Sequence, residues 1–483
     1  MLAPWVADEM QTVDLNDKRL NERLGLVLDQ LAGHPTASIP AACGGDAEIE
    51  AAYRLFGNEK VTFAKVLAPH IDRTRQRIAQ QAVVLVPQDT TEVDLTRPEQ
   101  QVVGVGPLDG DARRGALLHL LHAFTPDGTP LGTLHAHAWT RDDELPLSAA
   151  EREARKKHTP IEEKESWRWV TTFQQVQAEA QQSPQTQFVC LADSEADIYE
   201  LLVAGTAAPR AADWIVRACQ DRATRAADDE DAEVAQHLRE QVLAAPVLFT
   251  NTIRVRGRRA KVECDQRGRR QPRIGRTAEV EVRATRVTLR PPWRPDRKLP
   301  PVTVNVVMVR EIDPPAGEQP VEWILLTSLP IETIEQVRLV VQYYCVRWLI
   351  EIFFRTLKSG CRIEERRFEH IDRLLPCLAI YLIVTWRTLL VCRLGRSCPE
   401  ISCEAVFEPG EWKAVYHFVH REPPPRNPPK LADMVRLVAQ LGGYVNRKRT
   451  DPPGPQTVWL GLQRLHDIAL CYQTFGPGSE PEP

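Results

Sequence analysis

Three acidic residues, far apart in the sequence, have the surroundings expected of a metal-binding site. Asp89 follows the apolar run 83–86, Asp193 follows the apolar run 188–192, and Glu351 lies among cations in a segment with helical spacing. Carboxylate oxygens are the ligands that hard divalent ions prefer, and two such ions roughly 4 Å apart can promote phosphodiester cleavage. The three acids therefore predict a metal-dependent site that acts on phosphodiester bonds.

The segment around Glu351 predicts a helix with two different sides. At about 100° per residue, one side carries a phenol and four charged residues within roughly 80°: Tyr344, Arg347, Glu351, Arg355 and Lys358. The opposite side is apolar and carries Val346, Leu349, Ile350, Phe353 and Leu357. We expect the apolar side to pack on a core and the charged stripe to face outward. Such a stripe is also typical of a plain solvated helix.

The two aspartates are expected on strands. Residues 83–86 begin a strand with Asp89 near its end, and residues 188–193 form a second short strand that ends in an acid. Residues 116–124 and 131–139 predict a hairpin around a Pro-Asp-Gly turn. Helices are expected at 174–182 and at 194–203, with Ser194 as the N-cap of the second.

A basic, β-rich segment interrupts this pattern. Alternating segments at 252–255, 278–289, 302–309 and 323–326 predict strands, separated by turns rich in Arg, Gly and Pro. Between Arg254 and Lys298 there are 16 basic and 5 acidic residues, a local charge of +11 in a chain whose net charge is −4. Local fields steer a polyanion more than net charge does, so this insert favours nucleic acid as a partner.

The remaining segments are helical and complete the expected architecture. Leucines at positions 15, 20, 24, 28 and 31 recur at helical intervals. The cations of the same segment, Lys18, Arg19, Arg23 and Arg54, would suit contact with DNA or would simply lie on the surface of a helical domain. The order of elements fits an α/β protein with an RNase-H-like core. We expect a helical domain at 1–68, the core at 69–375 with its insert at about 245–330, and a helical region at 376–483.

The composition favours a cytoplasmic protein. The 11 cysteines show no CxxC pair, and the first ten residues lack the pattern of a signal peptide. The apolar stretch 374–392 is interrupted by Pro376, Thr385, Arg387 and Thr388, which favours a buried helix over a membrane span.

The segments around the three acids resemble the motifs of a known family. Gln-Asp-Thr-Thr at 88–91, Ala-Asp-Ser-Glu-Ala-Asp-Ile at 192–198 and the spaced set Tyr344, Arg347, Glu351 and Lys358 resemble the DDE motif and the Tyr-Arg-Glu-Lys signature of insertion-sequence family-four transposases. The resemblance is to the cut-and-paste transposases of the bacterial Tn5 kind, and it extends over nearly the whole chain.

The resemblance implies a reaction and partners. Asp89, Asp193 and Glu351 would bind two Mg²⁺ ions, which Mn²⁺ could replace. The enzyme would nick transposon ends, form and reopen a DNA hairpin, and join the freed 3′-OH to target DNA. Its partners would be the inverted-repeat ends, target DNA and a second copy of the chain in a synaptic dimer, in the bacterial cytoplasm with the nucleoid.

It also implies roles for neighbouring residues. Tyr344, Arg347 and Lys358 would contact phosphates near the cut, with Arg355 beside them on the same face. Trp323 matches a tryptophan on which the family stacks a flipped base, although a core tryptophan is the plainer interpretation. Arg217 matches a phosphate-binding arginine. Trp348 would line the pocket or simply pack.

Several alternatives stay open. Glu92, Asp94, Glu195 and Asp197 are rival metal ligands, and Asp94 is disfavoured because it and Asp89 would point to opposite faces of one strand. His135 and His137 would share a strand face, but a zinc site would need further ligands. In place of a transposase, the chain could be a stand-alone metal-dependent nuclease or an inactive DNA-binding relative.

Overall fold

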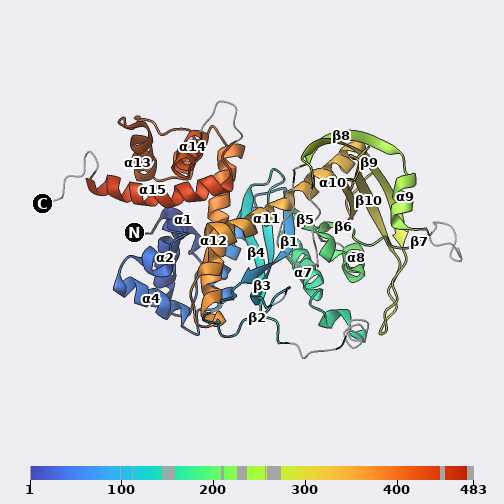
Figure 1. The fold of residues 1–483 in the computed structure, drawn as a ribbon, viewed down its shortest axis with the longest axis horizontal. Helices are drawn as coiled ribbons and strands as arrows, with labels where there is room; N and C mark the ends of the chain where they lie inside the picture. The colour runs from blue at the N-terminus through green and yellow to red at the C-terminus, as the bar shows by residue number, and fades with distance from the viewer. Residues whose placement is uncertain are drawn as a thin grey trace. The chain divides into compact units, whose positions relative to one another are not determined.

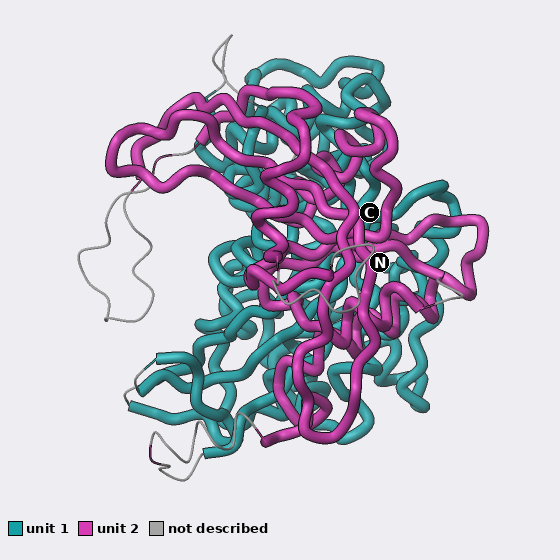
Figure 2. The backbone as a smooth tube through the Cα atoms, turned by 90° about the vertical axis from the view of Figure 1, so that its right-hand side faces the viewer, with its two compact units in different colours: residues 1–146, 348–483 teal, residues 147–347 magenta. Residues whose placement is uncertain are grey.

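The computed structural model divides the chain into two compact units (Figure 2). Unit 1 comprises Met1–Pro146 and Trp348–Pro483, and unit 2 comprises Leu147–Arg347. The structure describes residues 2–97, 99–110, 112–143, 148, 158–207, 211–225, 236–255, 257, 273–445 and 452–475. Strands and helices occur in both units, so the expected mixed α/β class is confirmed.

Unit 1 begins with five helices, and four of the five regularly spaced leucines lie on the second, while Leu15 precedes it. The helices are α1 (Pro4–Glu9), α2 (Lys18–Gly33), α3 (Ile39–Cys43), α4 (Asp46–Phe56) and α5 (Phe63–Ile78). The Asp17 side chain caps α2 by accepting hydrogen bonds from the backbone N–H groups of Arg19 and Leu20. Leu24, Leu28 and Leu31 lie buried on one side of α2, which explains their spacing.

Four strands follow in unit 1: β1 (Val83–Asp94), β2 (Gly106–Pro107), β3 (Arg114–Phe124) and β4 (Pro130–Trp139). Strand β3 pairs with β1 on one side and with β4 on the other, both antiparallel, which confirms the predicted hairpin. Gly128 in its turn has φ +86°, a conformation that favours glycine. The prediction that Asp89 lies near a strand end was wrong, because β1 stays paired with β3 for five further residues, to Asp94.

The second part of unit 1 is helical. It contains α11 (Trp348–Arg355), a π-helical turn at Thr356–Gly360, a 3₁₀ turn at Ile363–Glu365 and the long α12 (Ile371–Ser397). Within the described part of the chain, α12 is the helix long and apolar enough to cross a membrane, yet 83% of its most apolar stretch is buried inside the fold. The expectation of a buried core helix is confirmed.

The C-terminal helices of unit 1 form a separate hydrophobic cluster. A 3₁₀ turn at Cys403–Ala405 precedes α13 (Pro409–His420), α14 (Leu431–Leu441) and α15 (Pro455–Phe475). Helix α15 runs alongside both α13 and α14 (Figure 1), and buried Trp412, Met434 and Leu465 are among the residues that join them.

Unit 2 contains a sheet with helices around it. Its elements are a 3₁₀ turn (Ile161–Glu163), α7 (Trp167–Gln182), β5 (Gln187–Ala192), a 3₁₀ turn (Ser194–Ala196), α8 (Tyr199–Thr206), β6 (Asp213–Arg217), β7 (Thr224–Arg225), α9 (Leu238–Ala244), β8 (Val247–Val255), β9 (Arg276–Leu289), β10 (Val302–Glu311), β11 (Glu322–Thr327) and α10 (Ile334–Val346). The strand order is β5-β6-β11-β10-β9, with β7 and β8 also paired to β9. Strands β5 and β6 are parallel, and the others pair antiparallel.

Two predictions in unit 2 need correction. The helix expected at 194–203 is a 3₁₀ turn followed by α8, and the cap of that turn is Asp193 rather than Ser194. The helix expected at 174–182 begins seven residues earlier, at Trp167. The predicted β-rich segment is confirmed in strands β8 to β11.

Much of the described positive charge in this segment is paired within unit 2. Arg276 pairs with Glu311 and Glu318, Arg283 with Glu281, Arg294 with Glu200, and Arg297 with Glu162 and Asp296. The basic residues at 256 and 258–272 lie outside the described residues. The described strands alone therefore present less net positive charge than the sequence predicts.

Candidate active site

Asp89 lies on the face of the unit 1 sheet that α11 covers. Directly opposed residues of antiparallel strands project to the same face, and Asp89 opposes Leu120 while Val93 opposes Ala116. Val93, Ala116 and Leu120 belong to the same hydrophobic core as Ile350 and Phe353 of α11. The half-buried Asp89 therefore projects from the face on which α11 packs.

Glu351 is on α11 and is also half-buried. The apolar side of α11, with Ile350, Phe353 and Leu357, is inserted in this core, as the sequence predicts. The shared face of the sheet thus brings the first and third acids to one side of unit 1. Asp89 is held locally, because its Oδ1 accepts a hydrogen bond of 2.8 Å from the N–H of Thr90.

The helix predicted from Tyr344 to Lys358 is interrupted at Arg347, between α10 (Ile334–Val346) and α11, and its helical spacing changes again after Arg355. Residues Thr356–Gly360 form a π-helical turn, a feature that occurs often near functional sites. Lys358 lies in this turn, with its Nζ 3.5 Å from Oε1 of Glu364. Arg355 is exposed, and Trp348 at the start of α11 is 51% exposed. Their positions leave both side chains accessible to solvent.

In unit 2, Asp193 and Arg217 lie at the same edge of the sheet. Strands β5 and β6 are parallel, with Ala192 opposite Val216, so the residues that follow emerge side by side. The half-buried Asp193 accepts a hydrogen bond of 2.9 Å from the N–H of Glu195. Strand β11 runs antiparallel to β6 and places Leu325 opposite Arg217, so its first residues lie at this edge too.

Trp323, near the start of β11, contacts Tyr344 of α10. The two rings meet edge to face, with centroids 5.6 Å apart and planes at 69°. Arg347 lies over the Tyr344 ring, with its guanidinium carbon 5.9 Å from the centroid. Asp193, Arg217, Trp323, Tyr344 and Arg347 therefore form one group in unit 2, which we call the unit 2 cluster.

Burial dominates the electrostatics of Tyr344. It raises the pKa of the phenol to about 12, while Arg347 and Arg217 act to lower the pKa and Asp193 acts to raise it. A phenol is protonated near neutral pH even at its ordinary pKa, so the Tyr344 hydroxyl can donate a hydrogen bond, and the raised pKa extends this to higher pH. Tyr344 is 5% and Arg347 8% exposed, so the expectation that this part of the charged stripe faces outward was wrong. The Trp323 ring occupies the space beside Tyr344 that the spacing assigns to solvent.

The four rival acids are each paired with an arginine. Glu92 and Asp94 both contact Arg113, at 2.8 and 2.9 Å, and Glu195 contacts Arg168 at 3.0 Å. Asp94 also lies on the opposite face of β1 from Asp89, as its parity predicts. Asp197 is buried against Arg222, with Oδ1 to Nη2 2.6 Å, and accepts the N–H groups of Cys219 and Gln220. All four carboxylates therefore have an arginine partner in the structure, and that of Asp197 is the most enclosed.

The three predicted metal ligands are divided between the units. Asp89 and Glu351 belong to unit 1, and Asp193 belongs to unit 2. Within the described residues, no cluster of three or more His, Cys, Asp or Glu side chains is placed to hold a metal ion. The convergence of the three acids stays a prediction. His135 and His137 belong to no such cluster among the described residues.

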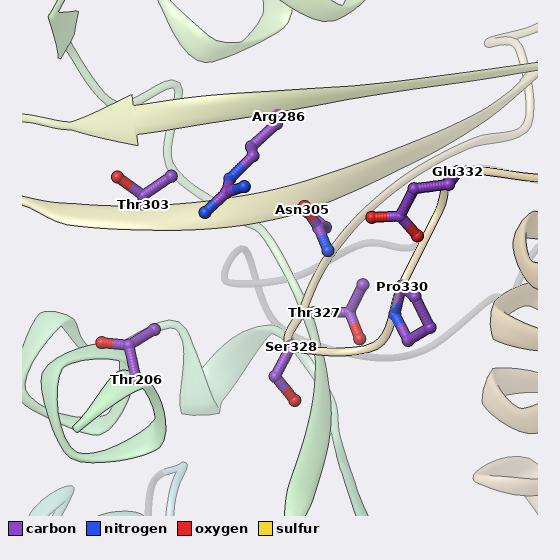
Figure 3. A pocket seen from close by; sticks show the side chains of 8 residues that line it. All are labelled: Thr206, Arg286, Thr303, Asn305, Thr327, Ser328, Pro330 and Glu332. Carbon is purple, nitrogen blue, oxygen red and sulfur yellow. The ribbon is translucent and has the colours of Figure 1, made fainter. Parts of the chain in front are cut away.

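A polar pocket of about 320 Å³ lies in unit 2, at the other end of β11 from Trp323. Figure 3 shows the guanidinium group of Arg286 and the carboxylate of Glu332 directed into it, above the hydroxyl groups of Thr327 and Ser328. The unit 2 cluster does not line this pocket. Two hydroxyl groups of the pocket already make hydrogen bonds within the protein: Thr327 donates to the Trp214 carbonyl and Ser328 donates to the Asp213 carboxylate.

Three family models match separate parts of the chain, in order along the sequence. "Transposase DNA-binding" matches residues 2–61, "Transposase DDE domain" matches 154–382, and "Transposase Tn5 dimerisation domain" matches 383–473. The chain is a DDE transposase of the Tn5 type. The DDE model spans Asp193 and Glu351 of this transposase, whereas Asp89 precedes the matched range.

Among solved structures, the transposase is similar to the piggyBac transposase in its synaptic complex with hairpin DNA. The two are 10% identical, with a TM-score of 0.33. The match covers 89% of this chain and 65% of that chain, so this transposase spans about two thirds of the length of that relative.

Proposed function

We propose that this transposase moves its element by a cut-and-paste reaction in which Asp89, Asp193 and Glu351 hold two Mg²⁺ ions, which Mn²⁺ can replace. The observation that carries the proposal is the unit 2 cluster. It sets two arginines, a protonated phenol and an indole beside the second acid of the motif. Cations and hydrogen-bond donors suit phosphates, and an indole suits a base.

The donor chemistry fits the metal. Three carboxylates supply the hard oxygen ligands that Mg²⁺ prefers. The rival carboxylates Glu92, Asp94, Glu195 and Asp197 each form an ion pair with an arginine. When bound, the ions would activate the attacking oxygen and stabilise charge on the phosphate that is cleaved. The metal requirement belongs to DDE domains in general, and the choice of Mg²⁺ is our proposal.

The chain's own residues would bind and orient the DNA. Arg217 and Arg347 would contact phosphates, and the Tyr344 hydroxyl, which is protonated near neutral pH like any phenol, would donate a hydrogen bond to a phosphate oxygen. Lys358 and the exposed Arg355 would contact phosphates further along the strand. Trp323 would stack on a flipped base, and the exposed Trp348 would pack against the DNA.

The proposed reaction proceeds by successive displacements at phosphorus. Water attacks at the element's end and releases a 3′-OH, and this 3′-OH attacks the opposite strand and closes a hairpin. A second water reopens the hairpin, and the 3′-OH then joins target DNA. Each step forms one P–O bond and breaks another, so one set of acids can serve all of them.

The matched models support a proposal for the roles of the domains. We propose that residues 1–68 bind the inverted-repeat ends, that residues 69–375 form an RNase-H-like core with its insert at about 245–330, and that residues 376–483 join two copies in a synaptic dimer. The site of action would be DNA in the bacterial cytoplasm.

Replacement of Glu351 by Gln tests the proposal. With DNA from the sequences that flank the gene, E351Q is expected to bind ends like the wild type and to lose Mg²⁺-dependent cleavage. The matched control is E195Q, because Glu195 is an exposed rival acid paired with Arg168. Cleavage by E351Q would contradict the mechanism, and cleavage without strand-transfer products by the wild type would favour a stand-alone nuclease.

A further inference from the structure

His119 lies on β3 of unit 1, on the face of the sheet opposite Asp89. Its partner across the strands is Thr90, so His119, Thr90 and Gln88 project together from that face. His119 and Gln88 are buried. Nothing in the local sequence around His119 points to these contacts, because its partners are about 30 positions away and only strand pairing brings them together.

The imidazole of His119 bridges the two residues that flank Asp89. Its Nδ1 lies 2.8 Å from Oγ1 of Thr90, and its Nε2 lies 3.2 Å from Oε1 of Gln88. A glutamine oxygen can only accept, so Nε2 carries the proton and donates to Gln88. In the neutral ring Nδ1 is then an acceptor, and the Thr90 hydroxyl donates to it.

Thr90 also contacts the carboxylate of Asp89, one of the three proposed metal ligands. Its backbone N–H donates to Oδ1 of Asp89 at 2.8 Å, while its side chain is fixed by His119. One residue thus connects a buried ring on one face of β1 to the carboxylate on the other. Because ring and amide are both buried, rotation of either would leave polar groups without partners at a cost in free energy.

We propose that His119 is a positioning residue that holds the β1 segment 88–90, and through Thr90 the carboxylate of Asp89, in the orientation needed to bind a divalent ion. The inference rests on the proposed function for the role of Asp89. Removal of a group that orients a metal ligand by hydrogen bonding typically lowers metal affinity or activity by roughly 10- to 100-fold.

Three substitutions separate the two hydrogen bonds. H119F removes both of them, H119N keeps an acceptor near the position of Nδ1, and H119Q keeps a donor near the position of Nε2. H119F is expected to raise the Mg²⁺ concentration for half-maximal cleavage roughly 10- to 100-fold, with end binding unchanged. H119N is expected to recover most of this loss and H119Q little, because the bond to Thr90 is the one that leads to Asp89.

A second measurement needs no metal. Amide hydrogen exchange at Thr90 is expected to be faster in metal-free H119F than in the wild type, since the N–H bonded to Asp89 is less firmly held. T90V, which removes the hydroxyl and keeps the branched shape, should reproduce both effects and add little to H119F. T90V also carries the test if H119F does not fold. The control is H137F, because His137 pairs with His119 across the strands, is exposed and stacks on Trp139.

The outcomes are distinct. If folded H119F and T90V keep the wild-type metal requirement and wild-type exchange at Thr90, the positioning role is wrong. If they lose only folded protein, in proportion to lost cleavage, His119 is merely structural and the inference is also wrong. If the wild type cleaves no DNA at any metal concentration, the proposed function fails, while the exchange measurement still decides whether His119 orders segment 88–90.

Discussion

The indole of Trp323 and the phenol of Tyr344 meet edge to face, 5.6 Å apart, where β11 and α10 adjoin in unit 2. The contact fixes the plane of an indole that is only half-buried, and the buried Tyr344 supports it from one side. A supported, partly accessible indole is a suitable platform for an unstacked base. A tryptophan that served only the core would be enclosed, as Trp214 in the same unit is.

Substitution W323A is expected to slow hairpin formation while end binding and the first nick persist. Loss of one stacked base costs about 1–3 kcal/mol, which corresponds to roughly 5- to 150-fold in rate if the base must be flipped before the hairpin closes. The measurement is gel analysis of nicked, hairpin and blunt products over time. W293A is the matched control, because Trp293 is a 68% exposed tryptophan of unit 2 outside the cluster. Equal hairpin rates in both variants would assign Trp323 to packing alone.

The placement of the acids on elements was predictable from local patterns. The run 83–86 and the run 188–192 are strands, and the apolar side of the helix that carries Glu351 packs in the core, because periods of 2 and 3.6 residues are set by backbone geometry. The alternation of side chains along a strand was also enough to predict that Asp89 and Asp94 lie on opposite faces of β1.

What could not be predicted depends on pairing across long separations. The burial of Tyr344 requires Trp323 on another element, and the role of His119 requires the register of β3 against β1. The pairing of Asp197 with Arg222, 25 positions apart, is what removes this acid from the candidates. Spacing within a helix or strand carries no information about such partners.

Substitution K358Q is expected to weaken DNA binding and to lower its salt dependence. If Lys358 neutralises one phosphate, the slope of log affinity against log salt concentration should fall by about 1. The measurement is a titration of labelled end DNA at several salt concentrations. The control is K430Q, because Lys430 is an exposed lysine of unit 1 paired with Glu400. An unchanged slope in K358Q would exclude a phosphate contact by this lysine.

Substitution D197N is expected to destabilise the protein without defining a metal site. It removes a buried charge and leaves Arg222 without its carboxylate partner, a change that costs about 3–5 kcal/mol. The measurement is denaturant-induced unfolding followed by fluorescence. E195Q should change stability by less than about 1 kcal/mol, because the Glu195 pair with Arg168 is solvent-exposed at the carboxylate. A stable D197N with an altered metal requirement would restore Asp197 as a ligand candidate.

Acid is expected to destabilise unit 1 through its enclosed histidines, and His135 allows a quantitative test. Burial, with a smaller effect of neighbouring His137, lowers the pKa of His135 to about 4, whereas an unfolded histidine titrates near 6.5. Between these values the unfolded state binds a proton that the folded state does not. The free energy of unfolding therefore falls as pH falls, by about 1.4 kcal/mol per pH unit for this one group.

Burial also lowers the pKa values of His70 and His122, so the wild type should lose stability more steeply than one histidine requires. The difference between wild type and H135N isolates His135: from pH 7 to pH 5 the variant should lose about 2 kcal/mol less stability. Denaturant-induced unfolding at several pH values measures this difference, and an NMR titration of the His135 ring checks its pKa directly. Parallel stability curves for the two proteins between pH 7 and pH 5 would show that His135 is readily protonated in the folded state, which its partial burial in the sheet argues against.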